Sequence, residues 1–162
     1  MTGDVSGDLT GRRLGNYRID GVLGKGGMSV TYKATDVRLG RKVALKVIGD
    51  HLGADAEFRE RFVDEARNTS AIDHANIVPV FDVGEHDGCP FFSLEFCSGG
   101  SLAALLQTGP LPPRPAAQLL ETLARAVQFA HEQGVAHRDL KPANVLLQLQ
   151  ADHGRHQVES EE

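Results

Sequence analysis

Three short segments of this sequence carry residue types that can bind and move a phosphate group. The first is the run Gly24-Lys25-Gly26-Gly27-Met28-Ser29. Backbone N–H groups approach a phosphate chain closely only where side chains are absent, so glycines gather in phosphate-binding loops. A plain tight turn also explains such a run, which has neither the strand-to-helix context of a dinucleotide fold nor a Gly-Lys-Ser/Thr phosphate loop. Its position between two predicted strands favours phosphate binding.

The second segment pairs a strand lysine with a helix carboxylate. Lys46 lies within Val43–Ile48, where an isolated lysine would simply point to solvent. Glu65 follows Phe62 by three residues, so it shares the apolar stripe of a predicted helix. A carboxylate on such a stripe needs a cationic partner or it protonates. We predict that Lys46 is this partner and that its ammonium group contacts phosphate oxygens under the glycine loop.

The third segment is His137-Arg138-Asp139-Leu140-Lys141-Pro142-Ala143-Asn144, which is too polar for a simple turn between apolar elements. Asp139 could orient an attacking hydroxyl and accept its proton. Lys141 could neutralise charge on a transferred phosphoryl group, and Asn144 could offer its amide oxygen to Mg²⁺. The segment therefore indicates a phosphoryl-transfer site.

Apolar periodicity predicts the elements that must position these residues. Strands are predicted at Tyr17–Leu23, from Val30, and at Lys42–Ile48, Ile77–Val83 and Phe91–Phe96, with a polar turn over Gly84–Gly88. A helix is predicted from Asp55 to Ala71, a break at Ser98-Gly99-Gly100, and further helices at Leu102–Leu106 and from Pro115 to Gly134. The fold class is therefore α+β.

The ordered set of motifs resembles the eukaryotic-type protein kinases, whose signatures are a glycine loop, a Val-Ala-Ile-Lys strand, a helix glutamate and a His-Arg-Asp…Asn loop. The Gly-Gly-Met-Ser and Asp-Leu-Lys-Pro-Ala-Asn forms are similar to the bacterial serine/threonine branch. The glycine-rich and polar composition of residues 1–15 predicts a flexible leader without a packed core. The resemblance implies a kinase N-lobe over 16–97, with a five-stranded antiparallel sheet and one helix. The start of a helical C-lobe would follow over 98–147, and an irregular tail over 148–162.

The resemblance also implies site residues, two cofactors and a partner. ATP would be bound by Leu23, Gly24, Lys25, Gly26, Gly27, Met28, Ser29, Val30, Thr31, Ala44, Lys46, Glu65, Glu95 and Cys97, with Leu94 as gatekeeper. Asp139 would be the catalytic base, Lys141 its electrostatic helper and Asn144 a ligand of Mg²⁺. The partner would be a protein with a Ser or Thr hydroxyl. His131 and His137 would be structural.

Three departures from the family pattern affect the expected activity. Ser29 stands where many kinases have a third glycine, and Thr31 replaces the usual valine over the adenine. No Asp-Phe-Gly follows Asn144, so we expect a polypeptide of these residues to transfer little or no phosphate. The alternatives are a non-catalytic nucleotide-binding or docking module of the same fold, a truncated or frame-shifted product without a stable fold, and an unrelated glycine-rich domain.

Composition limits the remaining function classes. The 162 residues are 41% hydrophobic and 24% charged, which is typical of one soluble domain. The net charge of -5 argues against broad binding to nucleic acid or anionic membranes. No apolar stretch reaches the roughly 18 residues of a membrane span. Two cysteines, Cys89 and Cys97, indicate a reducing compartment, and we expect a cytoplasmic protein. The scattered histidines argue against a metal centre of their own.

Overall fold

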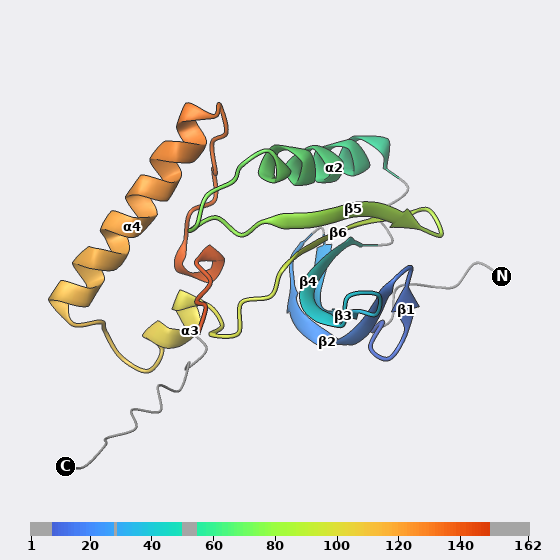
Figure 1. Ribbon diagram of the computed structural model, residues 1–162, viewed down its shortest axis with the longest axis horizontal. Coiled ribbons are helices and arrows are strands. Elements are labelled where there is room, and N and C mark those ends of the chain that lie inside the picture. Colours follow the sequence, from blue (N-terminus) through green and yellow to red (C-terminus); the bar gives the residue numbers. More distant parts are fainter. Residues whose placement is uncertain (1–7, 28, 50–54, 150–162) are drawn as a thin grey trace, which may run out of the picture. The chain divides into compact units, whose positions relative to one another are not determined.

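The computed structural model describes residues 8–27, 29–49 and 55–149 (Figure 1). Its elements are β1 (Arg13–Leu14), β2 (Tyr17–Lys25), β3 (Ser29–Asp36), β4 (Arg41–Ile48), α2 (Ala56–Ser70), β5 (Val80–His86), β6 (Cys89–Glu95), α3 (Leu102–Leu106), α4 (Pro113–Glu132) and the 3₁₀ turn η1 (Pro142–Asn144). The chain divides into two compact units, Met1–Phe96 with Leu111–Asp139, and Cys97–Pro110 with Leu140–Glu162. The predicted division into lobes at residues 97 and 98 stays a prediction.

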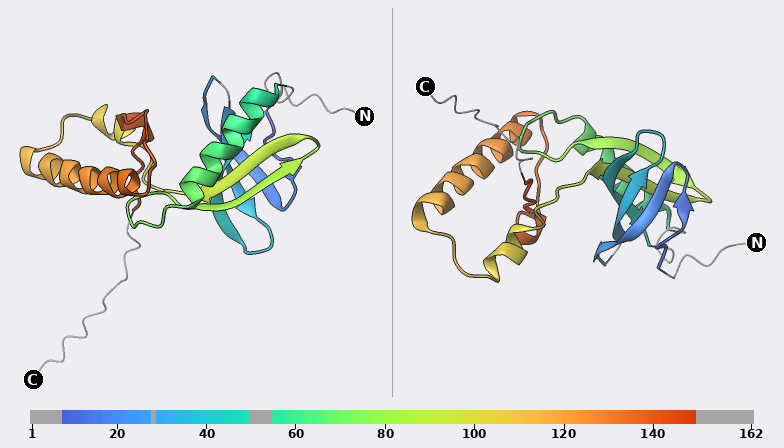
Figure 2. Two further views of the ribbon diagram at one scale, coloured as in Figure 1. Left: turned by 90° about the horizontal axis from the view of Figure 1, so that it is seen from above. Right: turned by 60° about the horizontal axis from the view of Figure 1, so that its bottom comes forward.

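The first unit is built on one antiparallel sheet with the strand order β1-β2-β3-β4-β6-β5. Helix α2 contacts β5 and β6, and the two views of Figure 2 show it running beside this hairpin. The predicted α+β class, with an antiparallel sheet and one helix packed on it, is confirmed. The sheet has six strands where five were predicted, because the two-residue strand β1 pairs with β2.

The additional strand belongs to the segment that was predicted to be a flexible leader. Leu9 and Leu14 are 5% and 7% exposed and belong to the core of the first unit. The N–H of Gly11 donates to the carbonyl of Ile19, and the N–H of Ile19 donates to the carbonyl of Arg12. The prediction of a leader without packing is therefore wrong for residues 8–15, where two leucines extend the core. Residues 1–7 lie outside the described residues.

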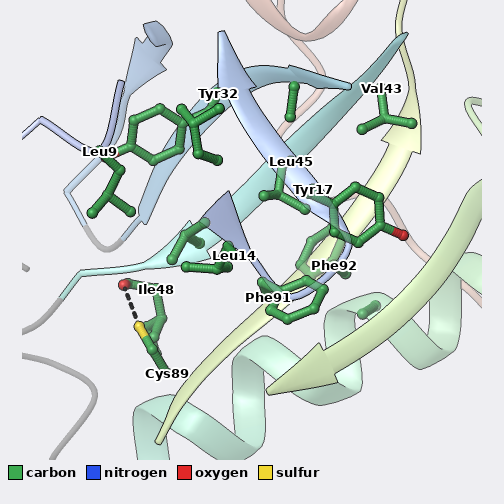
Figure 3. Close-up of a cluster of buried hydrophobic side chains, with 14 of the residues drawn as sticks. Leu9, Leu14, Tyr17, Tyr32, Val43, Leu45, Ile48, Cys89, Phe91 and Phe92 are labelled. Atoms are coloured by element: carbon green, nitrogen blue, oxygen red, sulfur yellow. Dashed lines mark hydrogen bonds between the residues drawn. The ribbon is translucent and has the colours of Figure 1, made fainter. Parts of the chain in front are cut away.

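The core of the first unit gathers apolar side chains from the whole sheet (Figure 3). Tyr17 lies edge-on to Phe91 with ring centroids 5.7 Å apart. The Tyr17 hydroxyl donates to Asp82 Oδ2 at 3.0 Å and is hydrogen-bonded to Ser93 Oγ at 3.0 Å. Burial raises the pKa of Tyr17, and these partners satisfy the hydroxyl that the core would otherwise isolate. The Cys89 thiol likewise donates to the carbonyl of Ile48, the dashed line in Figure 3.

The β5–β6 hairpin corrects the predicted turn over Gly84–Gly88. Strand β5 begins at Val80, three residues later than predicted, and continues to His86. The turn consists of Asp87 and Gly88, whose φ values of 49° and 78° are those of a tight two-residue hairpin turn. Gly84 lies within β5 and not in the turn, so its glycine is explained by packing. A Cβ at this position would lie 2.6 Å from Cζ of the buried Phe91 ring.

Replacing Gly84 with alanine is expected to lower the stability of the first unit by about 1–3 kcal/mol, because the buried ring of Phe91 must move to admit the methyl group. Thermal or urea denaturation measures this loss. Gly21→Ala is the matched control, since a Cβ at Gly21 meets no atom within 4 Å. We expect this second variant to differ from the parent chain by about 0.5 kcal/mol or less. Equal midpoints for the two variants would argue against the close approach.

The predicted helices of the first unit are confirmed. The Asp55 side chain caps α2 by accepting from the N–H groups of Glu57 and Phe58 at 2.9 and 3.4 Å. The apolar stripe of α2 buries Phe62 and Ala66. Helix α4 begins at Pro113, two residues before the predicted start at Pro115, and both prolines lie in its first turn, as the fixed φ of proline allows. Among the described residues, no helix is long and apolar enough to cross a bilayer.

The second unit is held together by backbone hydrogen bonds around Gly99 and Gly100. The N–H of Gly99 donates to the carbonyl of Leu147 at 2.7 Å, and the N–H of Leu147 donates to the carbonyl of Gly100 at 2.8 Å. A Cβ at Gly99 would lie 2.5 Å from that same Leu147 oxygen, so only glycine fits. The predicted break at residues 98–100 is thus a backbone pairing that ties the beginning of this unit to the segment after η1.

Candidate active site

The centre of the candidate site is an ion pair between β4 and α2. Lys46 Nζ donates to Glu65 Oε1 at 2.6 Å, which confirms the predicted pairing of these two residues. The prediction that Glu65 has apolar surroundings is wrong. Its side chain lies at the edge of the apolar stripe of the helix and is 54% exposed. A pair this exposed stabilises the fold by only about 0–1 kcal/mol. Its effect is therefore to set the position of the ammonium group.

Strand register places the predicted site residues of the sheet on one face. Lys46 lies opposite Thr31 on β3 and opposite Phe92 on β6. Ala44, two residues earlier on β4, lies opposite Leu94 and is 7% exposed. Residues directly opposite each other, and residues two apart along one strand, share a face of the sheet. Thr31, Ala44 and Lys46 are thus brought together on one surface.

The glycine loop forms the tip of the β2–β3 hairpin, where the Gly26 N–H donates to the Ser29 carbonyl at 2.8 Å. Gly24, Gly26 and Gly27 have φ values outside the left-handed region, and a Cβ at any of them would meet no atom closer than 3.5 Å. Neither the backbone conformation nor packing against the described residues requires a glycine at these three positions. The tip therefore leaves its backbone open to close approach, and the predicted binding of phosphate at this loop stays a prediction.

The other predicted residues of the loop flank this tip. Leu23 and Lys25 belong to the end of β2, where Lys25 lies opposite Val30. Leu23 is 49% exposed although it is apolar. Ser29 and Val30 begin β3 and are half-buried. Met28 lies outside the described residues.

The residues predicted to bind the adenine edge are divided between the two units. Glu95 ends β6, opposite Val43, and its N–H donates to the carbonyl of Pro79 at 3.2 Å. Leu94 is partly buried against the core of the first unit. Cys97 is half-buried and begins the second unit. The structure brings Leu94 and Glu95, but not Cys97, into the unit that holds Lys46.

The predicted catalytic loop is also divided. Asp139 ends the first unit, and its N–H donates to the carbonyl of His137 at 2.8 Å and toward His137 Nδ1 at 3.3 Å. His137 is thus hydrogen-bonded within the loop, and the structural role expected for it stays a prediction. Lys141 and Asn144 belong to the second unit, where the N–H of Asn144 donates to the carbonyl of Lys141 at 2.9 Å. All three side chains predicted to act in transfer are exposed.

Asn144, the residue predicted to bind Mg²⁺, ends the 3₁₀ turn η1. Mg²⁺ prefers six oxygen ligands, usually one or two carboxylates together with phosphate and water oxygens. Asn144 offers one neutral amide oxygen, and the described part of the chain has no group of three or more His, Cys, Asp or Glu placed to hold a metal. Asn144 could supply one ligand to an ion that the phosphates of a nucleotide also bind. One amide oxygen does not form a protein site that binds the ion by itself.

Comparison with known proteins defines the class of protein to which this site belongs. Residues 17–156 match the family of the protein kinase domain, and the chain belongs to this family. It is 39% identical over 136 residues to the serine/threonine-protein kinase PknB of Mycobacterium leprae, which covers 81% of this chain and 22% of the relative. It is also 39% identical over 141 residues to the serine/threonine-protein kinase PrkC of Bacillus subtilis, covering 86% of this chain and 22% of the relative.

Solved structures show the same fold. The crystal structure of the PknI kinase domain of Mycobacterium tuberculosis superposes with a TM-score of 0.73 at 30% sequence identity, over 86% of this chain and 57% of that one. The chain thus spans about a fifth of the length of the curated relatives and under three fifths of the solved kinase domain. The resemblance drawn from the motifs, including its bacterial serine/threonine branch, is confirmed.

One residue near the ion pair was missed by the sequence analysis. The ring of Phe92 lies under the ammonium group of Lys46, with Nζ 5.4 Å from the ring centroid. The signal for it was present, since Phe92 belongs to a predicted strand. The pairing of that strand with β4 could not be read from the sequence, because no local pattern specifies which strands become neighbours.

Proposed function

We propose that the first unit binds ATP, with its phosphates beneath the glycine loop and against Lys46, and that the segment His137–Asn144 serves the transfer of the γ-phosphoryl group to a Ser or Thr hydroxyl of a protein. The observation that carries the proposal is the 2.6 Å contact between Lys46 and Glu65 in a chain of the protein kinase family. A cation fixed at this point can neutralise phosphate charge without first being ordered by the ligand.

Each residue has a stated role in the proposed reaction. The loop from Gly24 to Gly27 presents backbone N–H groups to the phosphate oxygens, and Ala44 lies beneath the adenine. Asp139 orients the substrate hydroxyl and accepts its proton, while Lys141 neutralises charge on the phosphoryl group in transit. Asn144 contributes an amide oxygen to the ion bound by the nucleotide. Mg²⁺, when it arrives with ATP, supplies neutralisation of the β- and γ-phosphate charge.

ATP binding by the 162-residue chain is tested by comparing thermal stabilisation with ATP and with adenosine at equal concentration. We expect ATP to raise the melting temperature more than adenosine does, because the proposed contacts are mostly to phosphate. A ligand at 100 times its Kd stabilises the folded state by about 2.7 kcal/mol, which is readily detected in a melting curve. No shift at millimolar ATP, or equal shifts with both ligands, would overturn the proposal.

A non-catalytic nucleotide-binding module is the second candidate function. The observation in its favour is that residues 145–162 contain no Asp-Phe-Gly, whose carboxylate holds the metal ion in the family. On this account the 162-residue polypeptide binds ATP but transfers labelled phosphate to a generic protein substrate no faster than Asp139→Asn does. Transfer that is lost in both Asp139→Asn and Lys46→Met would exclude the second candidate and support the first.

A further inference from the structure

We propose that Phe92 is a positioning residue for Lys46. The aromatic ring of Phe92 holds the ammonium group of Lys46 at the place where this group meets phosphate. This inference rests on the proposed function. Lys46 and Phe92 are direct partners in the antiparallel register of β4 and β6. Their side chains therefore rise from the same face of the sheet at adjacent points. Nζ lies 5.4 Å from the centroid of the ring, within the range at which a cation is attracted to an aromatic face.

The ring is a rigid support for the cation. Phe92 is 2% exposed, so it has no room to turn away from Lys46. Behind it lies Phe62 of α2, with ring centroids 4.9 Å apart and planes inclined at 48°. The contact is stronger than it would be in water because the ring is desolvated on its buried side.

The same two rings also locate the other half of the ion pair. Phe62 is 7% exposed, and Glu65 follows it by one turn on α2. The position of Glu65 along the sheet is therefore fixed by the packing of Phe62 on Phe92. Lys46 touches Phe92 directly, and Glu65 reaches the same ring through its own helix. Phe92 thus supports both partners of the ion pair, whose own contribution to stability is small.

If Phe92 only filled the core, replacing it would not affect Lys46 more than replacing another buried phenylalanine of the same strand. The neighbouring residue Phe91 provides this comparison. Phe91 is also buried, at 5% exposed, but it lies opposite Val47 and packs edge-on to Tyr17. Successive residues of a strand face opposite sides of the sheet, so Phe91 is directed away from Lys46. Phe91→Leu and Phe92→Leu remove the same atoms from the same strand, and only the second removes the ring beside the ammonium group.

The direct test is the NMR position of the Lys46 side chain in the absence of nucleotide. With lysines labelled at Cε and Lys46 assigned through Lys46→Arg, the ε-methylene protons of Lys46 should lie upfield of those of Lys42, whose Nζ binds Asp20 and Thr35. The upfield shift should disappear in Phe92→Leu and persist in Phe91→Leu. A Lys46 signal at the Lys42 position in the parent chain would overturn the proposal, even if neither variant folds.

The second readout is ATP affinity. Phe92→Leu is expected to raise the Kd for ATP by about 2- to 30-fold, the range that corresponds to loss of one cation–aromatic contact, whereas Phe91→Leu should change it by less than about 2-fold. Equal effects of the two variants would overturn the positioning role. Failure of the parent chain to bind ATP would overturn the proposed function instead, and the NMR shift would still decide whether the ring holds Lys46.

Discussion

Replacing Lys46 with methionine is expected to weaken ATP binding by about 10- to 150-fold, the equivalent of one charge-assisted hydrogen bond of about 1.5–3 kcal/mol. Methionine keeps the apolar stem of the side chain against the sheet and removes only the ammonium group. The Glu65 carboxylate then faces the phosphates without its cation, which adds repulsion to the lost contact. Isothermal titration calorimetry with ATP measures the change.

The matched control for this prediction lies on the same strand. Lys42 also forms a close ion pair, with Nζ 2.8 Å from Asp20 Oδ2, and its contact with that carboxylate lowers the pKa of Asp20. Lys42→Met removes the same charge from β4 but leaves Lys46 in place. We expect its ATP affinity to stay within about 2-fold of the parent chain, apart from the weak long-range effect of one charge. Equal affinities of Lys46→Met and the parent chain would contradict the assigned role.

Replacing Phe62 with alanine is expected to destabilise the first unit by about 3–5 kcal/mol, the usual effect of removing a buried aromatic ring. Phe62 supplies the contact of α2 with Phe92 on the sheet, at 4.9 Å between ring centroids. Its loss leaves a cavity between the helix and β6 and releases the turn that carries Glu65. Urea denaturation followed by circular dichroism measures the loss of stability.

An exposed position on the same helix provides the comparison for Phe62. Arg61 pairs with Glu57 one turn earlier, and both side chains are more than two thirds exposed. Arg61→Ala should change the stability by about 0.5 kcal/mol or less, because such surface pairs contribute little. If Phe62→Ala cost no more than Arg61→Ala, the packing of α2 on the sheet would not be as described.

The predictable part of the site was the part specified by local spacing. The three-residue interval between Phe62 and Glu65 placed both on one helix face, and the structure confirms the helix and the pairing of Glu65 with Lys46. The glycine loop was predicted from composition, the structure places it at the tip of the β2–β3 hairpin, and its binding of phosphate stays a prediction. Among the described residues, no atom lies closer than 3.5 Å to a Cβ built at Gly24, Gly26 or Gly27.

The parts that were missed depend on contacts between distant segments. Strand β1 has two residues, too few for any alternation, and Leu9 and Leu14 become core residues only because the sheet lies beside them. Gly84 was read as a turn residue, although the need for glycine comes from the Phe91 ring on the next strand. Phe92 gains its relation to Lys46 from the pairing of β6 with β4. Long-range pairing of this kind leaves no periodic signal in one strand alone.

Amide chemical shifts recorded during an ATP titration of the 162-residue chain test the central claim most directly, because they locate the ligand residue by residue. The account predicts saturable shifts that are concentrated at Leu23–Gly27, Ser29–Thr31 and around Ala44 and Lys46. It predicts little change at the Asp87-Gly88 turn, at the opposite end of β6 from Glu95. Shifts that do not saturate, or that centre on that turn and leave the glycine loop and Lys46 unchanged, would contradict it.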